Sequence, residues 1–125
     1  MELINQFVIP GILFLLTLAF GFWLSRAGKP YNGVLFNIHK LIALGGVVWA
    51  GIQFSKTFHV PDWQLVVLLA VSALWVIALF VSGALMSAGK LNYVLMLTIH
   101  RVAPGALVLC CALALYFLGK SHAIP

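Results

Sequence analysis

Four long apolar stretches take up almost the whole of this chain. They run over residues 6–24, 33–54, 63–86 and 91–118, and each is close to the roughly 20 residues that an α-helix needs to cross a bilayer. Of the 125 residues 64% are apolar and only 7% are charged, which excludes a soluble globular domain. We therefore expect an integral membrane protein with four transmembrane helices.

The connections between these stretches are short, so consecutive helices must run antiparallel. The expected fold is all-α, a transmembrane four-helix up-down-up-down bundle that forms a single membrane domain over residues 1–125. Pro61 and Asp62 stand where an N-cap would begin the third helix. Gly28 and Gly89 stand where a left-handed residue would end the first and third helices.

The net charge of +5 could suggest nucleic acid, but the seven Lys and Arg residues stand singly near helix ends and form no basic stripe. They predict topology instead, because positive charge gathers on the cytoplasmic side of a membrane protein. Five of the seven lie in or beside the first and third connections, which leaves Lys56 and Lys120 for the other side. We expect both termini outside a bacterial or archaeal cell membrane, with the cytoplasmic side holding Arg26, Lys29, Lys40, Lys90 and Arg101.

An internal repeat appears when the sequence is compared with itself at an offset of 61 residues. Ala-Gly-Lys at 27–29 recurs at 88–90, and Ile-His-Lys at 38–40 recurs as Ile-His-Arg at 99–101. Each copy crosses the membrane twice, so both enter it in the same sense. The pattern predicts two parallel tandem helical hairpins, residues 1–61 and 62–125, related by a pseudo-two-fold axis along the membrane normal.

Two histidines of the repeat, His39 and His100, lie inside the second and fourth apolar stretches near the cytoplasmic side. Intramembrane histidines are rare enough that a functional role is the first hypothesis. Zinc and copper sites require three or four protein ligands, whereas a haem supplies four nitrogens itself and needs two axial ligands. The two imidazoles match a single haem b with His39 and His100 as iron ligands. The alternative is a pair of interhelical hydrogen bonds and no cofactor.

Each of these histidines is followed by a cation, Lys40 or Arg101, whose side chain should lean toward the cytoplasmic surface. Either cation could pair with an anionic haem propionate, so both are candidate cofactor-binding residues. The alternative role is to set topology alone. Small residues beside the histidines, among them Gly45 and Gly105, would let a flat macrocycle lie between helices.

The chain resembles the membrane b-type cytochromes, in which histidines of the second and fourth helices hold haem inside a four-helix bundle. The resemblance is carried by His39 with Lys40 and by His100 with Arg101, and it implies a bis-histidine haem. It departs from the two-haem pattern, in which each ligand helix carries a second histidine about four turns on, because Gln53 and Ala114 stand there. A second haem at His59 and His122, beyond the outer helix ends, is a weaker alternative.

The resemblance implies one-electron transfer with a quinol or a membrane redox partner, and an oxidoreductase if the chain catalyses a reaction at all. The sequence has no carboxylate near the two histidines, so it does not define a quinone pocket. The competing hypothesis is a cofactor-free membrane scaffold subunit or a small transporter, in which the histidines bond across an interface or relay protons.

Overall fold

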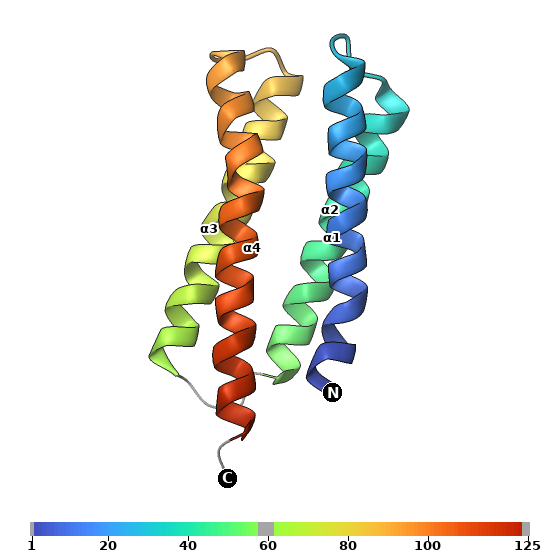
Figure 1. The fold of residues 1–125 in the computed structure, drawn as a ribbon. Coiled ribbons are helices and arrows are strands. Elements are labelled where there is room, and N and C mark those ends of the chain that lie inside the picture. The colour runs from blue at the N-terminus through green and yellow to red at the C-terminus, as the bar shows by residue number, and fades with distance from the viewer. Residues whose placement is uncertain (1, 58–61, 124–125) are drawn as a thin grey trace. The chain divides into compact units, whose positions relative to one another are not determined.

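The computed structural model describes residues 2–57 and 62–123 and contains four α-helices in that part of the chain. All four helices are long and apolar enough to cross a membrane, with candidate spans of 24, 25, 25 and 28 residues. This confirms the all-α class and the four transmembrane helices. In chain order they are α1 (Glu2–Ala27), α2 (Gly33–Thr57), α3 (Trp63–Ser87) and α4 (Tyr93–Ala123) (Figure 1).

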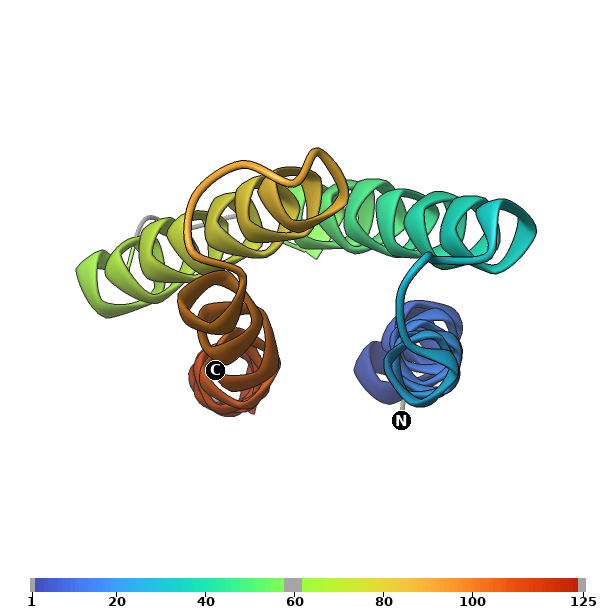
Figure 2. The same ribbon diagram turned by 90° about the horizontal axis from the view of Figure 1, so that it is seen from above.

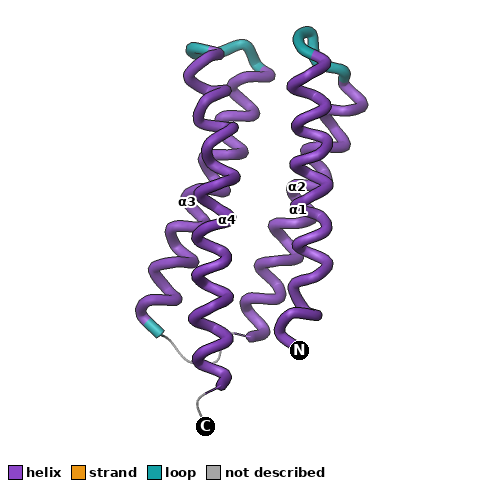
Figure 3. Tube along the Cα trace, in the orientation of Figure 1, coloured by secondary structure: helices purple, strands orange, loops and turns teal. Residues whose placement is uncertain are grey.

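The chain divides into two compact units, Met1–His59 and Val60–Pro125, and each is a helical hairpin. In the first hairpin α1 packs against α2, and in the second α3 packs against α4. Figure 3 shows the short loop that closes each hairpin. The helices of each pair are inclined to each other, as the view along the hairpins shows (Figure 2).

Contacts at the two ends of the first hairpin establish that its helices are antiparallel. Far from the loop, the ring centroids of Phe7 and Phe54 lie 4.7 Å apart. Near the loop, Gly21 of α1 lies against the imidazole of His39 on α2. Residue numbers rise along α1 as they fall along α2, which is the pairing that the short connection predicts.

The buried face of α4 follows a regular spacing of seven and four residues. Ala103 and Ala114 are 0% exposed, so at these positions the helix backbones can approach closely. The buried residues on α3 are seven, ten and four residues apart, and these spacings keep them on the one stripe of the helix that packs against its antiparallel neighbour. The buried residues are Leu65, Ser72, Ser82 and Met86 on α3, and Met96, Ala103, Leu107, Ala114 and Leu118 on α4.

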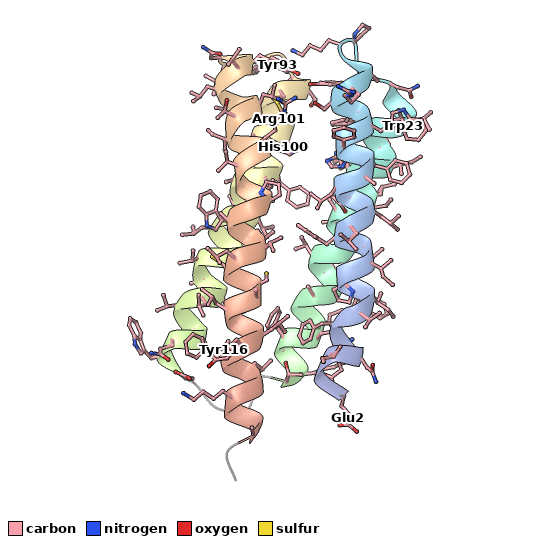
Figure 4. All side chains as sticks on the ribbon, viewed as in Figure 1. Glu2, Trp23, Tyr93, His100, Arg101 and Tyr116 are labelled. Carbon is pink, nitrogen blue, oxygen red and sulfur yellow. The ribbon has the colours of Figure 1, made fainter. Side chains whose placement is uncertain are left out.

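Large apolar side chains cover the outward faces of the helices. Leu15 in α1 and Leu74 in α3 are each 65% exposed, and Leu109 in α4 is 63% exposed, although all three lie in the middle of their helices. Water would not tolerate such continuous apolar faces, whereas the hydrocarbon of a bilayer would. In the second hairpin Tyr93 and Tyr116 lie toward opposite ends of α4, where an aromatic belt would meet the lipid headgroups (Figure 4).

Hydroxyl groups inside the spans bond to carbonyl oxygens of their own helices. Thr17 donates to Leu13 O at 2.7 Å, and Ser72 donates to Leu68 O at 2.7 Å. Among the residues that the structure describes, no buried side-chain nitrogen or oxygen lacks a hydrogen-bond partner. Helices that satisfy their own polar groups in this way can face lipid without a large desolvation cost.

The loops contain the turn residues that the sequence predicts. They also contain two helix N-caps that the sequence analysis did not predict. Gly28 and Gly89 are left-handed, with φ of 74° and 67°, as expected. Asp62 accepts a hydrogen bond from the N–H of Gln64 at 3.0 Å and caps α3 as expected, whereas Pro61 lies outside the described residues. Two further side chains begin the helices that carry the histidines. The side-chain oxygen of each accepts from the N–H groups of the second and third residues of its helix, and the two caps are Asn32 for α2 and Asn92 for α4.

Replacing Gly89 with alanine should destabilise the second hairpin. The end of α3 is a Schellman motif, in which Gly89 N donates to Met86 O at 3.3 Å and Lys90 N donates to Leu85 O at 3.1 Å. An L-residue with φ of 67° costs about 1 kcal/mol. We expect a lower thermal unfolding midpoint in detergent, followed by circular dichroism.

The control for this variant is Gly51→Ala in the middle of α2, where an added Cβ meets nothing within 4 Å. Alanine is the better helix former, so this change should leave the midpoint unchanged or raise it. Equal destabilisation by the two variants would contradict the predicted role of the left-handed turn.

Candidate functional site

His39 is held against α1 through one ring nitrogen. It lies on α2 seven residues after the Asn32 cap, and it is half-buried in the first hairpin. Its Nδ1 is 2.9 Å from the carbonyl oxygen of Thr17, one helix away and 22 residues earlier in the chain. The ring lies over Gly21, whose missing side chain leaves room for it. The hairpin thus fixes both the position and the rotation of this imidazole.

His100 repeats the arrangement in the second hairpin. Its Nδ1 is 3.0 Å from the carbonyl oxygen of Leu79, 21 residues earlier on α3, and its ring lies over Gly83. The same nitrogen also lies 2.9 Å from the Ser82 hydroxyl oxygen. Each histidine is therefore bonded to a backbone carbonyl of the helix that precedes its own, next to a glycine.

The carbonyl and the glycine stand four residues apart in both hairpins, as Thr17 with Gly21 and as Leu79 with Gly83. In an α-helix the Cα–Cβ bond tilts toward the N-terminus, so the side chain of residue i+4 lies over the carbonyl of residue i. A glycine at i+4 uncovers that carbonyl for a second hydrogen bond. The two residues form one receptor for an imidazole edge, which we call the glycine–carbonyl notch.

The notch has little space to spare. A Cβ built on Gly21 would stand 2.8 Å from His39 Cε1, and one built on Gly83 would stand 3.1 Å from His100 Cε1. Carbon atoms in contact normally lie 3.5–4.0 Å apart, so any side chain at either position would displace the ring. By contrast, a Cβ on Gly11, Gly45 or Gly105 would meet nothing within 4 Å.

The carbonyl bonds also determine the chemical form of the two imidazoles. A carbonyl oxygen can only accept, so in each ring the proton is on Nδ1. In the neutral ring the lone pair is then on Nε2, which lies 3.6 Å (His39) and 3.9 Å (His100) from a Cβ built on the glycine of its notch. Histidines that bind metals almost always have this arrangement, in which a backbone carbonyl or a carboxylate orients the ring and raises the basicity of the ligating nitrogen.

The two candidate propionate partners are exposed neighbours of the histidines on the same helices, Lys40 on α2 and Arg101 on α4. Figure 4 draws Arg101 nearer than His100 to the loop end of α4, which is the direction that a long side chain on this helix should take. In the first hairpin Arg26 lies over the ring of Phe22, with its guanidinium carbon 5.6 Å from the centroid. Most cations of each hairpin thus lie toward its loop, and Lys56 and Lys120 lie toward the other end.

The other two histidines, His59 and His122, are the candidates for a second, outer haem. His59 lies outside the described residues, so a second outer haem at His59 and His122 stays a hypothesis. The helix α4 continues to Ala123 rather than ending at residue 118, so His122 lies on helical backbone instead of just past the helix. Within residues 2–57 and 62–123, no group of three or more His, Cys, Asp or Glu could hold a metal ion.

Sequence reasoning found both histidines but missed the notches. Gly21 and Gly83 are 62 residues apart, so the comparison at an offset of 61 does not align them. Asn32 and Asn92, the caps of the helices that carry the histidines, are 60 apart and were missed for the same reason. A search for glycine 17 or 18 residues before each histidine would have found the notches.

Comparison with known proteins yields no relative from which a role could be transferred. No family model, no curated protein and no solved structure matches the chain. The function must therefore be argued from the site itself.

Proposed function

We propose that this chain is a haem b-binding integral membrane electron-transfer protein, in which His39 and His100 would hold one haem through its iron. One observation carries the proposal. Each imidazole is bonded through Nδ1 to a backbone carbonyl of the preceding helix, which leaves the lone pair on Nε2. The same arrangement appears twice, once in each hairpin and each time at an intramembrane histidine.

The donor set fits a haem better than a bare metal ion. A haem occupies four iron positions with its own nitrogens and requires two imidazoles, which is the number that the repeat supplies. Glycines with open space above them, Gly45 on α2 and Gly105 on α4, follow the histidines by six and five residues. They would let a flat macrocycle approach the helix backbones.

The residues of the chain have separate tasks in this proposal. The notches hold the imidazoles in one rotation with Nε2 unprotonated, and the lipid-facing helices exclude water. Lys40 and Arg101 would balance the charges of the haem propionates near the cytoplasmic surface. When bound, the haem would supply one-electron chemistry, and two histidine ligands favour electron transfer over oxygen binding because they fill both axial positions.

A haem near one face would exchange electrons at that face rather than carry them across the bilayer. We propose that the partner is a quinol or another membrane redox protein at the cytoplasmic surface, with both termini outside. The five cations in and beside the two loops support this orientation.

The first test is an absorption spectrum of the detergent-purified protein, expressed with ample haem. We expect a Soret band in the oxidised protein, and sharp α and Soret bands after reduction with dithionite. The pyridine haemochrome should give one haem b per chain. A protein that remains colourless under these conditions would overturn the haem proposal.

The second candidate function is a cofactor-free scaffold subunit or a small transporter, and the notches also favour it. A hydrogen bond from His39 to Thr17 O joins α1 to α2 whether or not a metal is present. Such bonds are worth roughly 0.6 kcal/mol on average inside membrane proteins. In this case the histidine variants would lower hairpin stability, and the purified protein would have no visible absorption.

A further inference from the structure

The second hairpin contains a hydroxyl group that sets its histidine apart. Ser82 on α3 is 2% exposed, and its Oγ lies 2.9 Å from His100 Nδ1 and 3.1 Å from Leu79 O. Since His100 Nδ1 is also 3.0 Å from Leu79 O, the three atoms form a closed triangle. The Nδ1–H is shared between two acceptors, and the serine hydroxyl gives its own proton to the carbonyl.

The first hairpin has no hydroxyl group at the position that corresponds to Ser82. Position 82 corresponds to Phe20 when the notches are aligned and to Gly21 when the histidines are aligned, and neither residue has a hydroxyl group. Thr17, which supplies the carbonyl for His39, donates its hydroxyl to Leu13 O at 2.7 Å. The notch is common to both hairpins, whereas the sequence places a serine beside it at this position in the second hairpin.

We propose that Ser82 is a positioning residue for His100 that fixes its ring and makes its Nε2 a stronger donor to the haem iron. This inference rests on the proposed haem site. Ser82 acts through Nδ1 in two ways. A second acceptor on the same side of the ring restricts its rotation about the Cβ–Cγ bond. It also draws the Nδ1–H bond further toward the acceptors, which makes Nε2 a stronger electron donor.

Both effects predict measurable properties of the bound haem. A stronger donor on one axial position favours the ferric over the ferrous ion, so Ser82 should lower the reduction potential. A restricted ring should also slow haem release, because the ligand stays aimed at the iron. Residues that support a metal ligand in this way typically contribute 10- to 100-fold to metal affinity.

The test compares Ser82→Ala with two other variants in the full-length, haem-loaded protein. Ser82→Ala removes the hydroxyl and leaves the Leu79 carbonyl bond in place. Ser82→Thr keeps a hydroxyl at the same position. The matched control is Ser72→Ala on the same helix, since Ser72 is 8% exposed and its hydroxyl is bonded to Leu68 O. The readouts are the midpoint potential from a spectroelectrochemical titration and the rate of haem transfer to excess apomyoglobin.

We expect Ser82→Ala to shift the reduction equilibrium toward ferrous iron by about 3- to 10-fold, or about 30 to 60 mV for one electron. Haem transfer should be about 10-fold faster, with circular dichroism unchanged. Ser82→Thr should return both values toward the wild type, and Ser72→Ala should change neither.

Three results would overturn the inference, and they are distinguishable. A coloured wild type whose potential and haem transfer rate are unchanged in Ser82→Ala would remove the role of Ser82 and leave the haem proposal standing. Equal changes in Ser82→Ala and Ser72→Ala would likewise make the effect one of general packing. A colourless wild type would overturn both the proposed function and this inference.

Discussion

Replacing either His39 or His100 with alanine is expected to abolish the α and Soret bands of the purified protein. In the proposed site, loss of one histidine would leave a single protein bond to the iron. The affinity for haem should then fall at least about 100-fold, which is more than the effect of losing a residue that only supports a ligand. Because the haem needs both ligands, the two single variants should be equally colourless. The measurement is the dithionite-reduced spectrum normalised to protein concentration.

The chain contains its own controls for these variants. His59→Ala and His122→Ala remove the two histidines that the proposed site does not use, and each should leave the spectrum and the haem content unchanged. A loss of half of the haem in either control would indicate a second haem toward the outer side. Full colour in both His39→Ala and His100→Ala would show that the ligands lie elsewhere.

The helices were predictable because the bilayer imposes a simple requirement on the sequence. A spanning helix must satisfy its backbone internally and present apolar side chains, so four apolar runs of suitable length translate directly into α1 to α4. The left-handed glycines Gly28 and Gly89 were predictable for a similar reason. A helix that ends over a short loop needs a positive φ, and glycine adopts it without a steric cost.

The notches were not predictable in the same way, because a backbone carbonyl has no sequence signature of its own. Only the glycine that uncovers it can be read from the sequence, and Gly21 or Gly83 by itself is no different from any other glycine in a transmembrane helix. The pairing with His39 or His100 depends on how far one helix is displaced along its neighbour. A displacement of one residue moves a contact by 1.5 Å and rotates it by about 100°.

The small differences between the two hairpins show which parts of the arrangement must stay together. The notch residues Thr17 and Gly21 of the first hairpin correspond to Leu79 and Gly83 of the second, both at an offset of 62 residues. The four-residue spacing of the notch is therefore the same in both hairpins. The histidine shifts by one residue relative to that pair, which changes the separation from 22 to 21. The bond survives because the imidazole needs only one exposed carbonyl and one missing side chain. The number of residues between the carbonyl and the histidine can therefore differ by one without loss of the bond.

Gly21→Ala is expected to produce the largest effect of any substitution that leaves both histidines in place. The added Cβ would stand 2.8 Å from His39 Cε1, so the ring must move away from α1 and lose its bond to the Thr17 carbonyl. The Nδ1 proton is then no longer fixed, and Nε2 is no longer aimed in one direction. We expect the affinity for haem to fall about 10- to 100-fold, measured by titrating the haem-free protein with hemin.

The matched control for this change is Gly11→Ala on the same helix, where the added Cβ meets nothing within 4 Å. Both variants replace glycine with a better helix former, so circular dichroism should show equal or greater helicity in each. Only Gly21→Ala should lose haem. Gly83→Ala should have a smaller effect, because its Cβ would stand 3.1 Å from His100 Cε1 and Ser82 would still hold the ring. If Gly21→Ala bound hemin as tightly as Gly11→Ala, the notch would be a packing detail and the bond to Thr17 would have no part in preparing His39 as a ligand.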